Sequence, residues 1–256
     1  MDNSIRQTIS PVVSNTEETP GSGSHLLWLE APEIAGTARP GQFVMVRCGD
    51  RYDPPLRRPL SINKVANGKQ IALFFKTVGK GTEWLSRCQA GDHVNLLGPL
   101  GNGFSIQPSS SNLLLVAGGI GIAPLVFLAE KALKKRYSVT LLMGARHYLY
   151  PNEQLPSKIN LHIFTEDGSE GKKGMVTDFI ADFIPWADQI FTCGPAPMYQ
   201  SIASQSNLKG KSVQISLEAR MGCGLGACYS CTIKTKKGMR QVCQDGPVFE
   251  LDDVLL

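Results

Sequence analysis

The 256-residue chain lacks any uninterrupted apolar run of about 18 residues, which a transmembrane helix would need. The N-terminal residues Met1 to Ser14 also lack the basic and then apolar pattern of a secretory signal. Basic residues are scattered and the net charge is only +4, which gives little support to nucleic-acid binding. We therefore expect a cytoplasmic protein that binds neither membranes nor nucleic acids, in a compartment reducing enough to preserve thiols.

Histidine is scarce too, and none of the four histidines lies in the segment where cysteines concentrate. That segment has the spacing C-x4-C-x2-C-x11-C, formed by Cys223, Cys228, Cys231 and Cys243. The first three match the plant-type 2Fe–2S spacing, and a fourth cysteine follows as the pattern demands. Gly222, Gly224 and Gly226 would let the loop bend tightly. We predict that the four thiolates bind a 2Fe–2S cluster in an electron-transfer system, because such a cluster moves one electron at a time.

The same four cysteines could instead bind zinc or form disulfides. A structural zinc site usually has two short cysteine pairs, or one cysteine pair and one histidine pair, whereas this segment has a single C-x2-C. Disulfides would suit a secreted chain with an even cysteine count, whereas this chain has seven cysteines. Cys48 and Cys88 lie far from the cluster segment and are expected to be ordinary buried thiols.

Residues 1 to 106 consist of short apolar segments separated by Gly and Pro, which predicts an antiparallel β-barrel. The expected strands are Gln42–Cys48, Leu60–Val65, Gln70–Val78 and His93–Leu97, with one short helix at Gly81–Arg87. The Gly21–Ser24 stretch is expected to form a flexible hairpin tip.

Residues 107 to 210 alternate apolar strands with helix-like runs, which predicts a doubly wound parallel sheet. The expected strands are Asn112–Ala117, Val139–Gly144, Asn160–Phe164 and Gln189–Cys193, and the expected helices are Ala123–Lys135, Val176–Phe183 and Ala196–Ser204. Residues 211 to 256 are expected to form a third domain, with a strand at Val213–Leu217 and a hairpin at Thr232–Gln241. Such a small domain generally needs a metal or similar staple.

Two motifs in the first region suit a flavin. Arg57 and Arg58 precede Pro59-Leu60-Ser61 at the start of a strand, where a guanidinium can hold pyrophosphate and a hydroxyl can reach the ring. Gly79-Lys80-Gly81-Thr82 then opens the short helix, whose free amides would bind an anion. Taken singly, the arginines could equally be surface charges and the glycine segment a plain turn.

Two motifs in the second region suit a nucleotide. Gly118, Gly119 and Gly121 join an apolar strand to a helix, although Pro124 stands where the usual G-x-G-x-x-G fingerprint has its last glycine. Pro124 is harmless in the first helical turn. Cys193-Gly194-Pro195 ends a later strand, and ligands gather at the carboxyl ends of parallel strands. Without those neighbours, Cys193 would be read as a buried strand-end residue.

The order of these motifs resembles the ferredoxin–NADP⁺ reductase superfamily and, within it, the electron-transfer subunits of class 1B dihydroorotate dehydrogenases. The resemblance spans nearly the whole chain and is carried by Arg39–Val44, Arg57–Ile62, Gly79–Thr82, Gly98–Phe104, Ala117–Leu125, Cys193–Pro195, Cys223–Cys231 and Cys243–Phe249. The C-terminal cysteine module is its most specific part, because flavin and NAD modules occur in many reductases. Related bifurcating and hydrogenase subunits can carry aspartate where this chain has Cys223.

The resemblance implies an oxidoreductase subunit without a catalytic general base of its own. FAD would contact Arg58, Pro59, Leu60, Ser61, Lys76, Gly79, Gly81 and Thr82. NAD would contact Gly118, Gly119, Gly121, Cys193 and Gly194. The implied partner is an FMN-containing dihydroorotate dehydrogenase subunit, in a heterotetramer of two plus two chains that serves pyrimidine biosynthesis.

Two alternative functions and one departure accompany this prediction. The chain could be the FAD and 2Fe–2S reductase subunit of another redox complex, such as a hydrogenase, oxygenase or bifurcating system, or a non-catalytic metal-binding module. The departure is that no acidic residue ends the strand Val139–Gly144, where a ribose diol usually finds one. Because Arg146 could instead face a 2′-phosphate, the preference for NAD over NADP rests on the resemblance alone.

Overall fold

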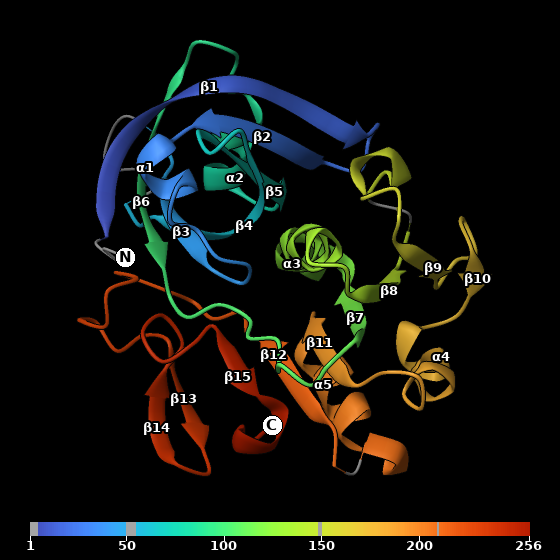
Figure 1. The fold of residues 1–256 in the computed structure, drawn as a ribbon. Helices are drawn as coiled ribbons and strands as arrows, with labels where there is room; N and C mark the ends of the chain where they lie inside the picture. The colour runs from blue at the N-terminus through green and yellow to red at the C-terminus, as the bar shows by residue number, and fades with distance from the viewer. Residues whose placement is uncertain (1–4, 50–54, 148–149, 209) are drawn as a thin grey trace.

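Six N-terminal strands close into an antiparallel barrel in the order β1-β2-β5-β4-β3-β6 (Figure 1). The computed structural model describes residues 5–49, 55–147, 150–208 and 210–256. The barrel contains β1 (Arg6–Thr19), β2 (Ser24–Glu30), α1 (Pro32–Ala35), β3 (Phe43–Arg47), β4 (Arg58–Ala66), β5 (Gln70–Lys76), α2 (Lys80–Ser86) and β6 (His93–Leu100). The predicted barrel is therefore confirmed.

The barrel interior is filled by the inward side chains of its strands. In β6 the burial alternates, so that Val94 and Leu96 are buried while their neighbours reach the surface. The interior cluster includes Leu27, Leu29, Val44, Val46, Ile62, Ile71, Leu73 and Phe75. This core belongs to the barrel itself and gives its rim a fixed position.

The first hairpin is the part of the barrel whose tip the sequence predicts but whose strands it does not. No strand is expected before Gln42, yet β1 pairs with both β2 and β6. Polar residues occupy much of the second half of β1, and its pairing with β2 has register shifts, so the apolar alternation is interrupted. The predicted hairpin tip near Gly21–Ser24 is confirmed, because β1 and β2 meet there.

The second region forms a seven-stranded sheet in the order β10-β9-β8-β7-β11-β12-β15. Its strands are β7 (Asn112–Gly118), β8 (Ser138–Ala145), β9 (Asn160–Thr165), β10 (Lys172–Lys173), β11 (Gln189–Cys193), β12 (Ser212–Ser216) and β15 (Val248–Glu250). Only β15 pairs antiparallel to its neighbour. The apolar residues 113–117 of β7 are buried, as expected for a central parallel strand.

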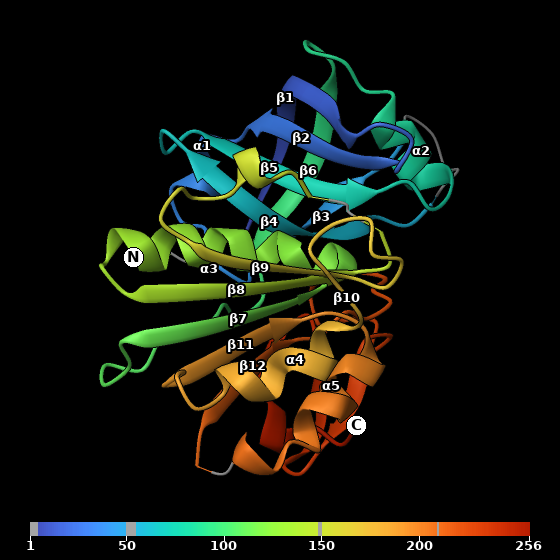
Figure 2. The ribbon, with the colours of Figure 1, turned by 90° about the vertical axis from the view of Figure 1, so that its right-hand side faces the viewer.

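Helices cover both faces of this sheet, which confirms the predicted doubly wound arrangement (Figure 2). Helix α3 (Ile122–Lys134) packs on one face, and α4 (Val176–Phe183) and α5 (Ala196–Ala203) pack on the other. Short 3-10 turns lie at Gly119–Gly121, Asn152–Gln154, Ser206–Leu208 and Leu251–Asp253. Within the described ranges, every helix is too short or too polar to cross a membrane.

Helix α3 lies between the sheet and the barrel and joins the two (Figure 1). Leu26, Ala72 and Phe74 of the barrel belong to the same buried cluster as the residues of α3. The buried Asn63 side chain of β4 donates a hydrogen bond of 2.9 Å to Ala123 O, and Tyr150 Oη donates to Asn63 Oδ1 at 3.1 Å. The two large regions are therefore packed against each other.

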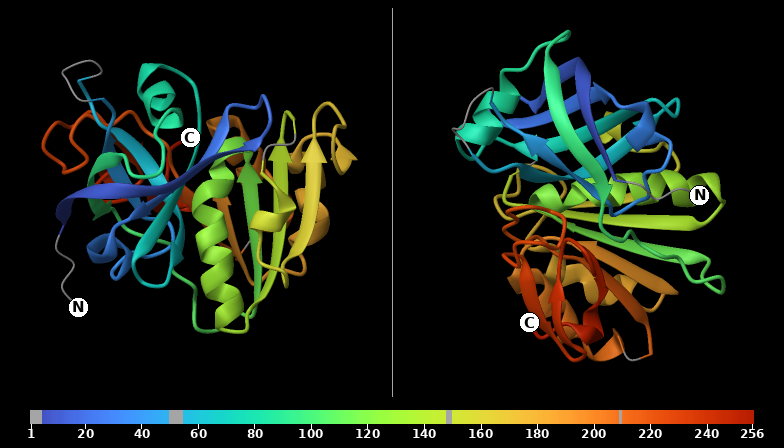
Figure 3. Two further views of the ribbon diagram at one scale, coloured as in Figure 1. Left: turned by 90° about the horizontal axis from the view of Figure 1, so that it is seen from above. Right: turned by 90° about the vertical axis from the view of Figure 1, so that its left-hand side faces the viewer.

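The C-terminal segment adds to the other regions as well as forming its own hairpin. Strands β13 (Thr232–Thr235) and β14 (Gly238–Gln241) pair as predicted. The cysteine loop lies beside the barrel, as the right-hand view of Figure 3 shows. Strands β12 and β15 extend the large sheet, although the sequence places them in a third domain. The boundaries 1–106, 107–210 and 211–256 stay a prediction.

Candidate functional site

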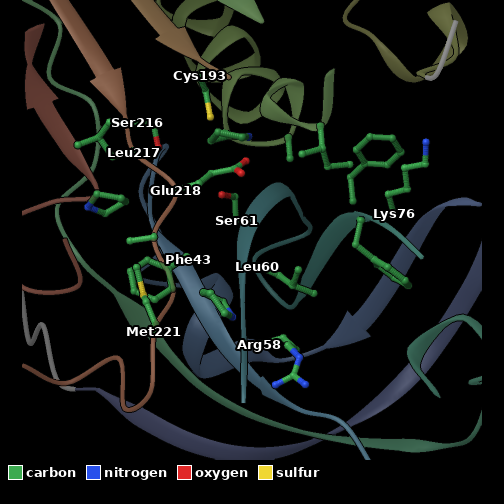
Figure 4. A pocket seen from close by; sticks show the side chains of 18 of the residues that line it. Phe43, Arg58, Leu60, Ser61, Lys76, Cys193, Ser216, Leu217, Glu218 and Met221 are labelled. Atoms are coloured by element: carbon green, nitrogen blue, oxygen red, sulfur yellow. The ribbon is translucent and has the colours of Figure 1, made fainter. Parts of the chain in front are cut away.

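A cavity of about 400 Å³ lies between the barrel, the start of α3 and the chain after β12 (Figure 4). Its lining includes seven residues predicted to bind cofactors: Arg58, Pro59, Leu60, Ser61, Lys76, Thr82 and Cys193. Ser61, Cys193 and Glu218 face this cavity from three separate elements (Figure 4). Aromatic and aliphatic side chains form much of the remaining wall. We call this space the flavin cavity, because its mixture of apolar walls, hydroxyls and one guanidinium suits a flavin nucleotide.

Arg57 and Arg58 are neighbours in sequence but have different environments. Arg57 Nη1 donates to Asn95 O at 3.2 Å, and Arg57 Nη2 donates to Asn95 Oδ1 at 2.7 Å. These bonds tie Arg57 to β6. Arg58 lines the flavin cavity, where Nη1 donates to Leu56 O at 2.6 Å. Arg58 is therefore the member of the pair that is placed to meet a phosphate.

The α2 turn differs in detail from the predicted anion site. Thr82 Oγ1 accepts hydrogen bonds from the amides of Val78 at 2.8 Å and Gly79 at 3.2 Å, so the Gly79 amide is not the free donor that the sequence predicts. Gly79 does not line either cofactor cavity. Gly81 lies behind Arg58, and a Cβ added at Gly81 would lie 2.9 Å from Arg58 Nε. This glycine therefore makes room for the arginine.

A second cavity, of about 580 Å³, lies over the carboxyl ends of the parallel strands. Gly118 and Gly119 from the β7 turn and Gly194 from the β11 turn line it. Gly121 lies just outside it, and a Cβ added there would lie 2.1 Å from Cys193 O. The glycine turn is thus required for close contact with the end of β11. We call this space the nucleotide cavity.

The two cavities share Ile120 and Glu218 in their walls. Beside this junction, Tyr199 Oη accepts a hydrogen bond of 2.9 Å from Gly194 N and donates one of 2.7 Å to Ser216 O. Burial raises the pKa of the Cys193 thiol, which keeps it neutral. Tyr199 therefore fixes the loop that places Cys193 and Gly194 between the cavities.

Sequence reasoning missed Glu218 and Tyr199. Protein atoms around Glu218 hinder its hydration and raise the pKa of its carboxyl, although the side chain reaches solvent through the open cavities. Glu218 directly follows a predicted strand, so the rule that ligands gather at strand ends could have identified it. Tyr199 carries no comparable signal, because it lies on a helix distant in sequence from Ser216.

The four C-terminal cysteines lie in two pairs. Cys231 Sγ and Cys243 Sγ are 3.4 Å apart and both residues are buried. Cys228 is exposed, and hydrogen bonds from Ser230 and then Cys223 lower its pKa to about 6. Burial raises the pKa of Cys243 to about 12. One pair thus faces outward and the other faces the protein interior.

This arrangement fits a binuclear cluster. Backbone amides of Leu225 and Gly226 donate to Cys223 Sγ and Cys243 Sγ, each at 3.3 Å, which supports thiolates. Gly224 has φ +74°, and a Cβ there would lie 2.5 Å from Met45 Cγ, so the loop needs glycine to approach the barrel. Within the described ranges, no three His, Cys, Asp or Glu side chains surround a single metal position. Two thiolates on each of two irons would suit a grouping of the sulfurs in pairs.

Side chains of one buried cluster connect the inner cysteine pair with the flavin cavity. Cys231 and Cys243 belong to the same buried cluster as Phe43 and Met221. Phe43 and Met221 also line the flavin cavity. The thiol site and the flavin cavity are therefore on opposite sides of a shared wall.

Comparison with known proteins agrees with this geometry. Residues 218–255 match the family described as the iron–sulfur cluster binding domain of dihydroorotate dehydrogenase B. A protein of Desulforamulus reducens, named "Dihydroorotate dehydrogenase B (NAD(+)), electron transfer subunit", is 42% identical over 236 residues, which are 88% of this chain and 90% of that protein. A protein of the same name from Clostridium acetobutylicum is 40% identical over 85% of this chain and 87% of its own length.

Solved structures are similar in fold over most of the chain. A structure described as giving insights into flavin-based electron bifurcation in the NADH-dependent reduced ferredoxin-NADP oxidoreductase has a TM-score of 0.85 and 30% identity. It covers 97% of this chain and 90% of its own. The ferredoxin reductase in carbazole 1,9a-dioxygenase has a TM-score of 0.68 at 19% identity, covers 79% of this chain and 66% of its own, and so supports the fold alone.

The match at the cysteine segment confirms the expected iron–sulfur class of the C-terminal site. The relatives cover most of this chain at about 40% identity, which confirms the prediction of an oxidoreductase and is contrary to a non-catalytic metal-binding module. The chain belongs to the family of electron transfer subunits of dihydroorotate dehydrogenase B.

Proposed function

We propose that this chain passes electrons from an FMN-containing catalytic subunit, which oxidises dihydroorotate, through a 2Fe–2S cluster and FAD to NAD⁺ in pyrimidine biosynthesis. The observation that carries the proposal is that Phe43 and Met221 line the flavin cavity and also belong to the buried cluster that contains Cys231 and Cys243. The flavin supplies the conversion between single electrons and a hydride, which the cluster alone cannot perform. The protein supplies distance, orientation and exclusion of water.

The cluster ligands in this proposal are Cys223, Cys228, Cys231 and Cys243. The FAD pyrophosphate binds the guanidinium of Arg58, and the Ser61 hydroxyl and the backbone of Pro59 and Leu60 meet the ring. Lys76 and Thr82 complete the cavity. Gly79 and Gly81 act indirectly, since Gly79 donates to Thr82 and Gly81 accommodates Arg58.

NAD⁺ occupies the nucleotide cavity, with its phosphates near Gly118 and Gly119 and its nicotinamide near Cys193 and Gly194. The buried Cys193 thiol excludes water from the junction, and Tyr199 holds the Gly194 loop in place. Gly121 contributes by allowing the two turns to approach. No side chain of this chain is required as a general base for the carbon substrate, which binds to the partner.

The pair of half-buried Cys223 and exposed Cys228 faces the side from which the catalytic subunit docks. In the same loop, Leu225 is 42% exposed and Tyr229 is 70% exposed, so a docked partner can bury both side chains. The family name implies a catalytic subunit, and we extend this to a heterotetramer of two plus two chains located in the cytoplasm.

The test is to isolate the full chain anaerobically with the protein that co-purifies. We expect flavin absorbance, the electron paramagnetic resonance signal of a reduced 2Fe–2S cluster, and reduction of both centres by dihydroorotate when the partner is present. A reconstituted chain with neither flavin absorbance nor NADH-dependent dye reduction would contradict the proposal.

A second candidate function is a reductase subunit of a bifurcating complex. It is favoured by the similarity to the structure described with flavin-based electron bifurcation, which is 30% identical over 97% of this chain. Addition of dihydroorotate to the purified complex separates the two functions, because the second predicts no reduction of the flavin by that compound.

A further inference from the structure

One side-chain hydroxyl lies against a sulfur of the C-terminal cysteine site. Ser230 Oγ is 3.1 Å from Cys228 Sγ, which is within hydrogen-bond distance for sulfur. Cys223 Sγ and Cys243 Sγ accept hydrogen bonds from backbone amides instead. Among the residues that the structure describes, Ser230 is thus the one whose side-chain hydroxyl contacts any of the four sulfurs. The Cys228 sulfur therefore has a hydrogen-bond partner that a substitution can remove.

Two further contacts hold the Ser230 hydroxyl in place. Gly222 N donates a hydrogen bond of 3.0 Å to Ser230 Oγ, and Arg220 O lies 3.3 Å from the same oxygen. Both backbone groups belong to the chain that enters the cysteine loop, so Ser230 connects the start of the loop with its outer cysteine. The hydroxyl is therefore fixed beside the Cys228 sulfur already in the isolated chain.

The Ser230 hydroxyl has a single proton and two possible acceptors for it, Arg220 O and Cys228 Sγ. A cysteine that binds a metal is a thiolate, which has no proton and can only accept a hydrogen bond. A hydrogen bond to a charged acceptor is stronger than one to a neutral carbonyl. We therefore expect the Ser230 proton to point at the sulfur when the site is loaded.

The position of this contact makes it sensitive to a docked partner. Cys228 and Ser230 are both exposed, so in the isolated chain water also reaches the sulfur. A subunit that docks on this face excludes that water, and the Ser230 hydroxyl, held by Gly222 and Arg220, remains as a proton donor. The complex is therefore the form in which the hydroxyl matters most.

We propose that Ser230 raises the reduction potential of the iron–sulfur site by donating a hydrogen bond to Cys228 Sγ. The inference rests on the proposed function, in which Cys228 is one of four ligands of a 2Fe–2S cluster. Reduction adds one negative charge, and a proton donor at a sulfur stabilises that charge, so the reduced state gains more from the bond than the oxidised state. Ser230 thus acts through Cys228 and favours the entry of electrons from the partner.

The test measures the reduction potential in the complete complex, by recording the electron paramagnetic resonance signal at a series of fixed potentials. The wild-type complex is compared with Ser230→Ala and Ser230→Thr. We expect Ser230→Ala to lower the ratio of reduced to oxidised centres on the order of tenfold at a given potential, which is a downward shift of about 59 mV for one electron. Ser230→Thr keeps the hydroxyl and should retain the wild-type potential.

Thr232→Val is the matched control, because it removes a hydroxyl from the same loop whose hydrogen bond of 2.7 Å goes to Tyr229 O and not to a sulfur. This variant should leave the potential unchanged. The inference is overturned if Ser230→Ala with full iron content has the wild-type potential, or if Thr232→Val shifts the potential equally.

A second measurement on the wild-type complex applies if Ser230→Ala does not retain iron. Brief exchange into D₂O replaces hydroxyl protons sooner than hydrogen-bonded backbone amides, and pulsed electron paramagnetic resonance of the reduced centre should then detect a coupled deuteron. Absence of that coupling also overturns the inference. In each of these cases, a 2Fe–2S signal that dihydroorotate produces in the wild-type complex would still support the proposed function. A wild-type complex without that signal would overturn both.

Discussion

The barrel and the cysteine segment achieve their order in different ways. The barrel encloses a cluster of buried residues contributed by its own strands, short helices and loops, with Phe127 of α3 as the one member from outside residues 1–106. The cysteine segment buries Met221, Val242 and two thiols, and it does so against Phe43, Met45 and Leu100 of the barrel. The barrel is therefore stabilised mainly by its own core, whereas the cysteine segment is stabilised by packing on the barrel and by the group that its thiols bind.

The largest expected effect comes from Cys231→Ser, which removes a ligand from the buried pair. We expect electron transfer from the partner to NAD⁺ to fall by more than the roughly 100-fold that loss of a ligand's supporting contact can cost. Hydrogen exchange should increase in residues 218–255 and remain unchanged in the barrel. NADH-dependent dye reduction should persist, because the flavin cavity does not include this thiol.

The matched control is Cys88→Ser, which changes a barrel thiol that donates to Trp84 O at 3.5 Å, a bond that serine can also make. This variant should retain its iron content. Equal loss of iron in the two variants, or undiminished electron transfer in Cys231→Ser, would refute the distinction between the regions.

Leu27→Ala tests the self-sufficiency of the barrel. Leu27 is fully buried, so we expect the free energy of unfolding to fall by about 2–5 kcal/mol in urea titration. Leu225→Ala is the comparison in the cysteine segment, where the side chain is 42% exposed and the expected change is within about 0.5 kcal/mol. A larger loss in Leu225→Ala than in Leu27→Ala would show that the barrel core contributes less to the free energy of unfolding than expected.

Asn63→Leu examines the attachment of the barrel to the sheet. The substitution removes the acceptor of the buried Tyr150 hydroxyl and the donor to Ala123 O. We expect a loss of about 1–3 kcal/mol in the free energy of unfolding. A double-mutant cycle with Tyr150→Phe should reveal coupling between the two side chains. Strictly additive effects would mean that the hydrogen bond contributes nothing to the attachment.

The smallest expected effect is the pH dependence caused by Glu218, where the sheet meets the cysteine segment. Burial raises the pKa of Glu218 above its ordinary value of 4.5. The folded state therefore holds this proton more tightly than the unfolded state, and stability falls as pH rises from the ordinary pKa through the raised one. Between pH 5 and pH 8, the decrease in Tm should be smaller for Glu218→Gln than for the wild-type chain. Identical profiles would contradict the assignment of the raised pKa.

Local patterns in the sequence predicted the features that depend on residues close together in the chain. The cluster ligands could be predicted directly from the spacing of four cysteines, Cys223, Cys228, Cys231 and Cys243. The continuous apolar run of β7 likewise predicts a central parallel strand. The tip of the first hairpin was predicted, but its strands β1 and β2 were not. Much of the second half of β1 is polar and its pairing with β2 is irregular, so the alternation of β1 is visible only once its partners are known.

The parts of the site that could not be predicted depend on pairings between distant segments. The resemblance names Arg58 rather than Arg57 as the FAD contact, and only the position of Asn95 gives the physical reason, since it shows that Arg57 is held by β6. Likewise, Arg146 directly follows β8 and Glu166 directly follows β9, and their adjacency follows from the register of the two strands. A search for an acidic residue along β8 alone therefore found none.

Ile120 and Glu218 belong to the walls of both cavities, and from this common boundary we expect the two binding equilibria to be interdependent. A ligand that contacts Glu218 in one cavity can change the surface that Glu218 presents to the ligand in the other cavity. Thermodynamic reciprocity then requires that occupancy of either compartment change the affinity of the other by an identical factor. Titrating NAD⁺ into flavin-free and flavin-loaded chain would measure that factor, and a value of one would show that the boundary is rigid.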